Sequence, residues 1–198
     1  LIHWEKHPGN PIIEADPKWY ELLDLDAWHD QAWRDPWVFE HEGLFHAFIT
    51  ARVNHGDADA RGVIAHAEST DLIHWQVKPP VTEPGDFGQL EVPQLIQSGD
   101  QYHLVFSTDK FTHSKAYLKR TGRFPVTGAA RYSGPSPFGP FESLDNPWIF
   151  GDRFGSLYSA KVLNIKDQDW SLIAFENYAA DGGFIGRITD PFTVTKEE

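Results

Sequence analysis

Short stretches in which apolar and polar residues alternate recur along the whole chain, separated by residues that favour turns. This period of two, with its Val, Ile, Phe and Tyr residues, is typical of β-strands. The helical period is weak throughout, and its best candidate, 17–28, is expected to be a surface loop or a short turn of helix. The pattern therefore predicts an all-β fold. The expected strands are 37–40, 44–50, 61–69, 72–77, 91–97, 101–107, 128–134, 139–144, 158–164, 170–177, 183–190 and 191–195.

Segment 1–8 (LIHWEKHP) nearly repeats segment 72–79 (LIHWQVKP), which indicates a repeated structural unit. Taken four at a time, the expected strands form units at 33–80, 89–145 and 156–195, and segment 1–8 is the last strand of an earlier unit. Four-stranded units of this length are typical of β-propeller blades, and a propeller closes with about four to eight of them. We therefore expect about three blades of a larger propeller domain. An ordinary antiparallel sandwich, with a chance similarity between the two segments, is the alternative.

The composition narrows the class of partner. The chain has 198 residues and a formal net charge of −12, so neither a nucleic acid nor an anionic membrane is an expected partner. Its 8 Trp, 6 Tyr and 14 Phe suit carbohydrate binding, because sugar rings stack on aromatic planes. The absence of Cys excludes disulfides and thiolate chemistry, and leaves an extracellular or a cytoplasmic location open.

The first strand of each blade is the innermost one in a propeller, so the starts of these strands meet around one pocket. Asp35 and Glu91 lie at two such starts, each shortly before a Pro. Cleavage of a glycosidic bond needs one protonated carboxyl group and others that are ionised. The apolar neighbours of Glu91 favour a protonated acid, and Arg34 favours an ionised Asp35. In the alternative interpretation, Asp35 forms a structural salt bridge with Arg34, and Glu91 ends a strand on the surface.

Two motifs add a family resemblance. The segment Trp-Arg-Asp-Pro-Trp-Val-Phe (33–39) resembles the Arg-Asp-Pro motif of glycoside hydrolase family 32, and Leu-Glu-Val-Pro-Gln (90–94) resembles that family's acid/base segment. Val92 stands where the family usually has Cys. Segments 158–162 and 71–75 also resemble phrases found in such enzymes. The resemblance implies a five-bladed β-propeller that acts on β-fructosides such as sucrose, levan or inulin, with retention of configuration.

The resemblance also implies residue roles. Glu91 would be the general acid/base, Asp35 the transition-state stabiliser, and Arg34 a ligand of the same fructosyl hydroxyls. The family's nucleophile is an Asp in a first-blade motif that this sequence lacks, so no residue here is given that role. The other candidates for substrate binding are Trp33, as part of a stacking wall, and Tyr158 and Lys161, at the start of a first strand.

Three alternatives remain open at this stage. A fructosyltransferase of the same fold would pass the sugar to another sugar instead of water. A related five-bladed hydrolase would act on arabinose or xylose, and a sugar-binding propeller would lack catalysis. His3, His7, His55 and His66 are the histidines that suggest a metal, but the ten His are scattered, so neither a metal site nor a cofactor is expected.

Overall fold

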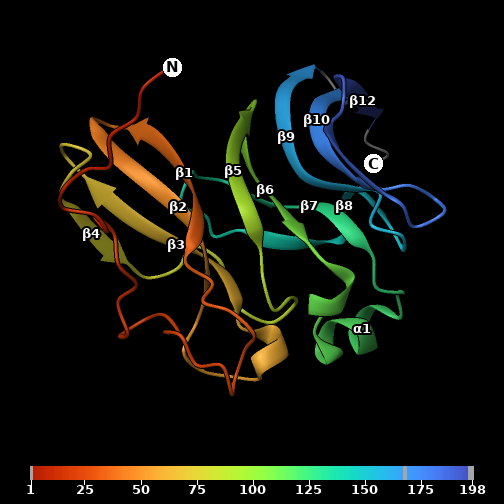
Figure 1. The fold of residues 1–198 in the computed structure, drawn as a ribbon, viewed down its shortest axis with the longest axis horizontal. Coiled ribbons are helices and arrows are strands. Elements are labelled where there is room, and N and C mark those ends of the chain that lie inside the picture. Colours follow the sequence, from red (N-terminus) through yellow and green to blue (C-terminus); the bar gives the residue numbers. More distant parts are fainter. Residues whose placement is uncertain (1, 167–168, 196–198) are drawn as a thin grey trace.

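The computed structural model describes residues 2–166 and 169–195 and consists mainly of three antiparallel β-sheets (Figure 1). The first two sheets each contain four strands, hydrogen-bonded in the order in which they occur in the chain. The first sheet consists of β1 (Arg34–His41), β2 (Leu44–Arg52), β3 (Gly62–Ser69) and β4 (Trp75–Lys78). The second sheet consists of β5 (Glu91–Ser98), β6 (Gln101–Thr108), β7 (Thr127–Gly134) and β8 (Glu142–Asp152).

The third sheet is narrower than expected. It contains β9 (Leu157–Lys166), β10 (Asp169–Tyr178), β11 (Phe184–Ile188) and β12 (Phe192–Thr195). β9 pairs with one edge of β10, and both β11 and β12 pair with the other edge. The prediction that the last two segments form a third and a fourth strand side by side is therefore wrong. Together they follow one edge of β10, interrupted around Pro191.

The all-β prediction is confirmed, and each of the strands expected between residues 37 and 195 overlaps an observed one, although 139–144 shares only its last three residues with β8. The chain forms three successive sheets, and at least the first strands of each are paired in chain order. A sandwich, the alternative prediction, would have two facing sheets. The number of blades in the whole protein and the closure of a ring stay predictions. The same holds for the blade boundaries at 33–80, 89–145 and 156–195.

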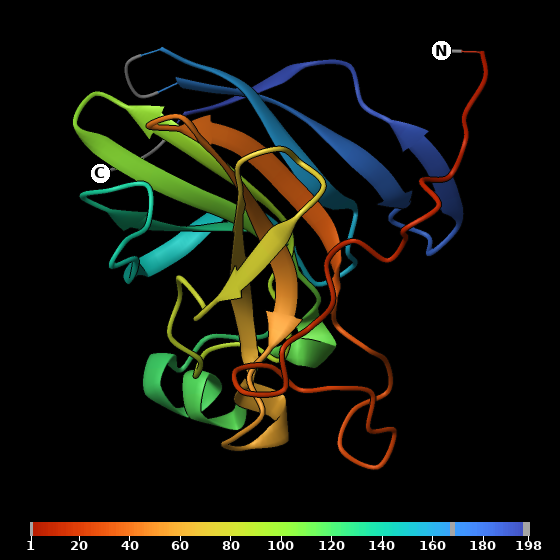
Figure 2. The same ribbon diagram turned by 90° about the vertical axis from the view of Figure 1, so that its left-hand side faces the viewer.

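The expected strand at 1–8 is not formed. Leu1 lies outside the described residues, and residues 2–8 have no strand structure (Figure 2, red). The similar segment at 72–79 does contribute β4, which begins only at Trp75 and pairs with β3 from Ser69. A β-strand needs a hydrogen-bonded neighbour, so similarity of sequence alone does not make segment 2–8 a strand. Its assignment to an earlier blade stays a prediction.

The structure also contains a short helix that the sequence pattern missed. α1 (Lys115–Thr121) begins after Ser114, whose hydroxyl accepts a hydrogen bond from the Tyr117 N–H, and it ends at Gly122 with φ 64°. Both are standard helix-capping signals. The described residues also form two 3-10 turns, η1 (Ala58–Ala60) and η2 (Lys110–Thr112). No helix in the described part of the chain is long and apolar enough to cross a membrane.

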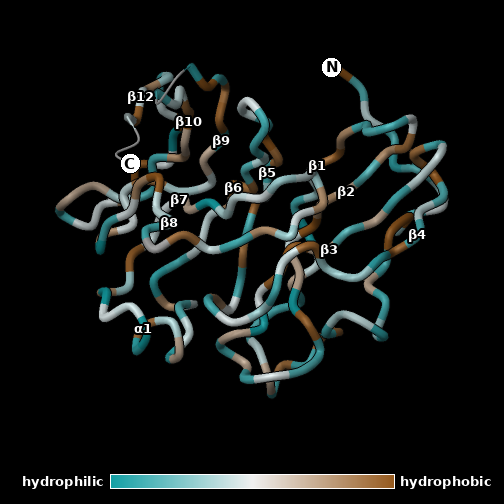
Figure 3. The backbone as a smooth tube through the Cα atoms, turned by 180° about the vertical axis from the view of Figure 1, so that it is seen from behind, coloured by the Kyte–Doolittle hydropathy of each residue, from teal (hydrophilic) through white to brown (hydrophobic). Residues whose placement is uncertain are grey.

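Apolar side chains between neighbouring sheets hold the three sheets together. Phe48 and Ile64 of the first sheet pack in one cluster with Leu104 and Phe106 of the second. A second cluster joins the second and third sheets, and its buried members are Val105, Ala129, Ala160, Val162, Trp170, Leu172 and Ala174. Brown, hydrophobic stretches accordingly recur along the strands in Figure 3. This packing sets the three first strands, β1, β5 and β9, side by side.

The long loop before β1 covers the outer face of the first sheet. Segment 17–28 forms turns and no helix, as expected for a loop. Tyr20 is buried against the sheet, and its hydroxyl donates to the Lys78 carbonyl at 2.6 Å. Glu21 accepts from Arg52 Nε at 2.8 Å and from Arg61 Nη1 at 2.5 Å. These contacts fasten the loop that leads into the start of β1.

Candidate functional site

The first strand of each sheet begins with the same backbone irregularity. Asp35 (φ 58°), Val92 (φ 47°) and Ser159 (φ 50°) adopt the left-handed conformation, which non-glycine residues rarely do. The pairing register with the second strand shifts at the same place in all three sheets. Each is therefore a β-bulge, a feature that is common beside active sites and that redirects side chains.

The residues just before these three positions are equivalent to one another and meet in space. They are Arg34 on β1, Glu91 on β5 and Tyr158 on β9. Arg34 Nη2 donates to Glu91 Oε1 at 2.5 Å, and the Tyr158 hydroxyl donates to Glu91 Oε2. Glu91 thus receives one hydrogen bond from each neighbouring sheet. The expectation that the starts of the first strands converge is confirmed for these side chains.

The electrostatics follow from this packing. Burial lowers the pKa of Arg34, but the hydrogen bond and charge of Glu91, helped by nearby carboxylates, outweigh it and raise the pKa. Burial raises the pKa of Tyr158, and the charge of Glu91 raises it further, so the phenol stays protonated. Burial lowers the pKa of Lys161, and the negative charge of Asp35 offsets only part of this decrease. Arg34 and Tyr158 are therefore fixed donors that orient the Glu91 carboxylate.

Asp35 lies beside this group with its carboxylate more open. Its Oδ2 is 3.7 Å from Arg34 Nε and accepts a hydrogen bond of 3.3 Å from Thr50 Oγ1. Its side chain is 31% exposed, against 18% for Glu91. The predicted arrangement of charges is partly wrong. Arg34 lies closer to Glu91 than to Asp35, and Glu91 contacts a cation and a phenol in place of apolar neighbours.

Trp33 and Lys161 are both held by backbone groups. Trp33 Nε1 donates to the Ile13 carbonyl at 3.1 Å, and its ring lies 5.1 Å from that of Tyr20. Lys161 Nζ donates to the carbonyls of Val92 (2.9 Å) and Pro93, so it ties β9 to the bulge of β5. These contacts give each residue a supporting position at the site. Direct contact of either residue with a substrate stays a prediction.

Asp30, in the loop before β1, is a further neighbour of the site. Its Oδ2 is 3.6 Å from Arg34 Nη2, and its Oδ1 accepts from Gln89 Nε2 at 2.8 Å. Gln89 is buried and lies two residues before Glu91. The only feature of the sequence that could indicate this ion pair is the spacing of four residues between Asp30 and Arg34. Such a spacing predicts a contact only in a helix, and this segment is a loop.

The arrangement brings three carboxylates around one guanidinium at the converging ends of the first strands. A group of this kind can hold hydroxyls, move a proton and stabilise positive charge. The residues named from the resemblance are thus in one place, and their catalytic roles stay a prediction.

No protein-family model matches the sequence, and no curated protein matches it significantly. Solved structures do match. Inulosucrase from Halalkalicoccus jeotgali, bound to kestose, superposes with a TM-score of 0.73 at 20% identity, over 94% of this chain and 53% of its own.

Two levansucrase structures agree equally well. Bacillus subtilis levansucrase gives a TM-score of 0.71 at 12% identity, over 94% of this chain and 54% of its own. A levansucrase in complex with sucrose gives 0.74 at 12% identity with the same coverage. The fold of this chain corresponds to about half of the length of each matched protein. Identities this low establish the fold alone, and the chain spans about half the length of the structures that it matches.

Proposed function

We propose that the protein acts on β-fructofuranosides of the sucrose type, cleaving the bond to the fructosyl group. The observation that carries the proposal is the meeting of Arg34, Glu91 and Tyr158, with Asp35 beside them, at the bulged starts of three strands. The matched structures are an inulosucrase bound to kestose and levansucrases, one of them with sucrose. Sucrose and kestose are both β-fructofuranosides. Fold and side-chain chemistry therefore support the same substrate class.

In this proposal Glu91 is the general acid/base. It gives a proton to the leaving oxygen and then takes one from the group that attacks the fructosyl intermediate, as in retaining enzymes. Such a group must keep one orientation through both steps. The hydrogen bonds from Arg34 and Tyr158 supply that constraint, because they hold both carboxylate oxygens from opposite sides.

Asp35 is proposed as the stabiliser of the transition state. Its partly exposed carboxylate offers oxygens to the fructosyl hydroxyls and negative charge to the developing oxocarbenium ion. The bulge at φ 58° turns Asp35 differently from its neighbours, so it need not share the direction of Arg34. We assign the nucleophile to none of the described residues.

Transfer of the fructosyl group to another sugar is favoured over hydrolysis. The matched enzymes are fructosyltransferases, and nothing in the group around Glu91 distinguishes an attacking water from a sugar hydroxyl. The acceptor decides the outcome, and both reactions share the first step.

The test is to incubate the whole protein with sucrose and to quantify free glucose and free fructose. We expect glucose to be released, with free fructose below glucose because part of the fructosyl group is transferred. Equal amounts would indicate a hydrolase. Aryl arabinofuranosides and xylosides serve as controls and should release no phenol. If sucrose binds but no glucose appears, the protein is a sugar-binding propeller and the proposal fails.

A further inference from the structure

Two histidines and a glutamate lie together on one face of the first sheet, away from the group around Glu91. His46 on β2 pairs directly with Glu68 on β3, and His66 pairs with Phe48. Because side chains alternate along a strand, His46, His66 and Glu68 share a face. One nitrogen or oxygen of each lies within 4.8 Å of the others. Side chains of these types at this spacing match the requirements of a metal site.

The two imidazoles approach each other through ring nitrogens. His46 Nδ1 and His66 Nε2 are 2.9 Å apart, so two lone pairs would meet there unless a proton or a cation lies between them. The two rings also stack, with their centroids 5.2 Å apart and their planes at 28° to each other.

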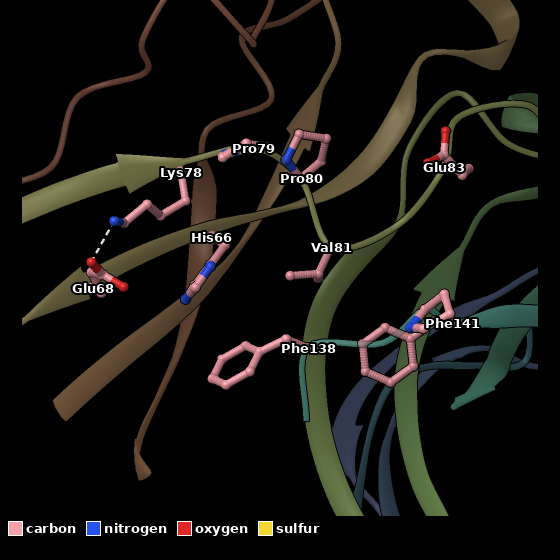
Figure 4. A pocket seen from close by; sticks show the side chains of 10 residues that line it. His66, Glu68, Lys78, Pro79, Pro80, Val81, Glu83, Phe138 and Phe141 are labelled. Atoms are coloured by element: carbon pink, nitrogen blue, oxygen red, sulfur yellow. Dashed lines mark ion pairs between the residues drawn. The ribbon is translucent and has the colours of Figure 1, made fainter. Parts of the chain in front are cut away.

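The surroundings of the cluster leave it accessible from one side. His46 is 4% exposed, whereas His66 and Glu68 line an open pocket of about 490 Å³ together with Lys78 and Phe138 (Figure 4). Lys78 forms an ion pair with Glu68, and the Phe138 ring lies 5.2 Å from that of His66. Lys78 is a flexible side chain at the pocket rim, so its ammonium group can leave Glu68 to a competing cation.

We propose that His46, His66 and Glu68 bind a divalent transition-metal cation of the Zn²⁺ type. Two imidazole nitrogens and one carboxylate oxygen form the donor set of three-ligand zinc sites, which keep a fourth position open. Imidazole favours Zn²⁺, Cu²⁺ or Ni²⁺ over Mg²⁺ and Ca²⁺. The sequence had led us to expect no metal site.

The second sheet provides a matched comparison within the same molecule. The positions equivalent to His46, His66 and Glu68 hold His103, Arg131 and Ser133, because the strands pair in the same register. His103 Nδ1 is 2.9 Å from Ser133 Oγ. A cationic Arg131 and a neutral hydroxyl cannot replace an imidazole and a carboxylate as metal ligands. The second sheet should therefore bind no such cation.

The test is titration of the whole protein with ZnCl₂ by calorimetry, after treatment with a chelator. We expect binding of one Zn²⁺ per chain, with Mg²⁺ unable to compete. His66→Gln and Glu68→Gln should each weaken Zn²⁺ binding at least about tenfold, because the loss of a residue that only hydrogen-bonds to a metal ligand already lowers metal affinity by that factor. Ser133→Ala is the matched control, and it should leave the affinity unchanged.

Circular dichroism establishes that each variant is folded, and both substituted residues are only partly buried. Exposed histidines such as His3 and His74 can bind Zn²⁺ loosely, so the variants decide the outcome. The proposal is overturned if no site of one equivalent exists. Affinity that is unchanged in both His66→Gln and Glu68→Gln, or weakened equally by Ser133→Ala, also overturns it. None of these outcomes depends on activity towards fructosides.

Discussion

The first and second sheets share a strand order and a bulge in the first strand, but they carry different chemistry. Both begin with a bulge at a residue of positive φ, Asp35 in one and Val92 in the other. The residue before the bulge is Arg34 in the first sheet and Glu91 in the second. One sheet therefore offers a cation followed by a partly exposed carboxylate, and the other offers a carboxylate followed by an apolar residue.

This difference shows how a repeated unit can build an asymmetric site. The bulge presents the same position from each sheet to a common centre, so equivalent residues become neighbours in space. Arg34, Glu91 and Tyr158 then form one hydrogen-bonded group, although the chain separates them widely. Only one sheet places a carboxylate on the bulge itself. In the proposed function this gives Glu91 and Asp35 separate roles.

The largest expected effect comes from Glu91, the residue of the second sheet that the other two sheets hold. We expect Glu91→Gln to lower turnover of sucrose by about 10²- to 10⁴-fold, because an amide cannot give a proton to the leaving oxygen. Fructosides with a leaving group that needs no proton should lose much less in the first step. Burst kinetics on an activated aryl fructoside measure that step. Equal losses on both substrates would contradict the acid role.

The corresponding change in the first sheet is Asp35→Asn. Asn tolerates the left-handed conformation, so this variant removes the charge and keeps the bulge. We expect kcat to fall by about 10²- to 10³-fold, as for the loss of one preorganised electrostatic contact in a transition state. The loss should be similar for sucrose and for the activated fructoside, in contrast to Glu91→Gln. Unchanged turnover in a folded variant would support a purely structural role of Asp35 beside Arg34.

Much of this molecule follows from its sequence, because alternation of apolar and polar residues fixes strands wherever a neighbour exists to pair with them. The convergence of Glu91 with Arg34 also follows, once first strands are taken as innermost. The carboxylate that Arg34 contacts most closely does not follow from the sequence. Sequence proximity suggested Asp35, and its carboxylate does lie 3.7 Å from Arg34 Nε, but the carboxylate of Glu91, from another sheet, lies closer at 2.5 Å.

Other errors have equally local causes. The strand expected at 1–8 lacks a partner among the described residues, and β11 and β12 share an edge because β10 is long enough to pair with both. α1 is too short to show a period, although Ser114 and Gly122 mark its ends. The histidine cluster needs the register of β2 and β3, which no single segment reveals.

A smaller effect concerns His103, the residue of the second sheet that is equivalent to His46 of the first. Burial, and to a lesser degree Arg131, lowers the pKa of His103 from 6.5 to about 4. The unfolded chain then binds a proton below pH 6.5 that the folded chain refuses, so stability is full above that pH and falls as the pH is lowered towards 4. Between pH 6.5 and about pH 5 this amounts to about 2 kcal/mol.

The measurement is urea unfolding across that range for the wild type and for His103→Asn. We expect the variant to have a flatter dependence of unfolding free energy on pH, with the largest gap between the two slopes below pH 6. His46 and His66 remain in both proteins, so the difference isolates the second sheet. Parallel slopes would show that His103 is protonated as readily in the folded protein as in the unfolded one.

The smallest expected effect tests the bulge of the second sheet itself. Val92 is β-branched and has φ 47°, a conformation that costs a non-glycine residue roughly 1–2 kcal/mol. The equivalent Asp35 bears this conformation more easily, since Asp and Asn bond locally to the backbone. Val92→Asn should therefore raise the free energy of unfolding by about 1 kcal/mol. Lys161 Nζ donates to the backbone carbonyl of residue 92, which is present in both proteins. A change in stability would therefore not come from the loss of this hydrogen bond. Urea unfolding checks the value, and a less stable variant would mean that packing of the Val92 side chain outweighs the backbone strain.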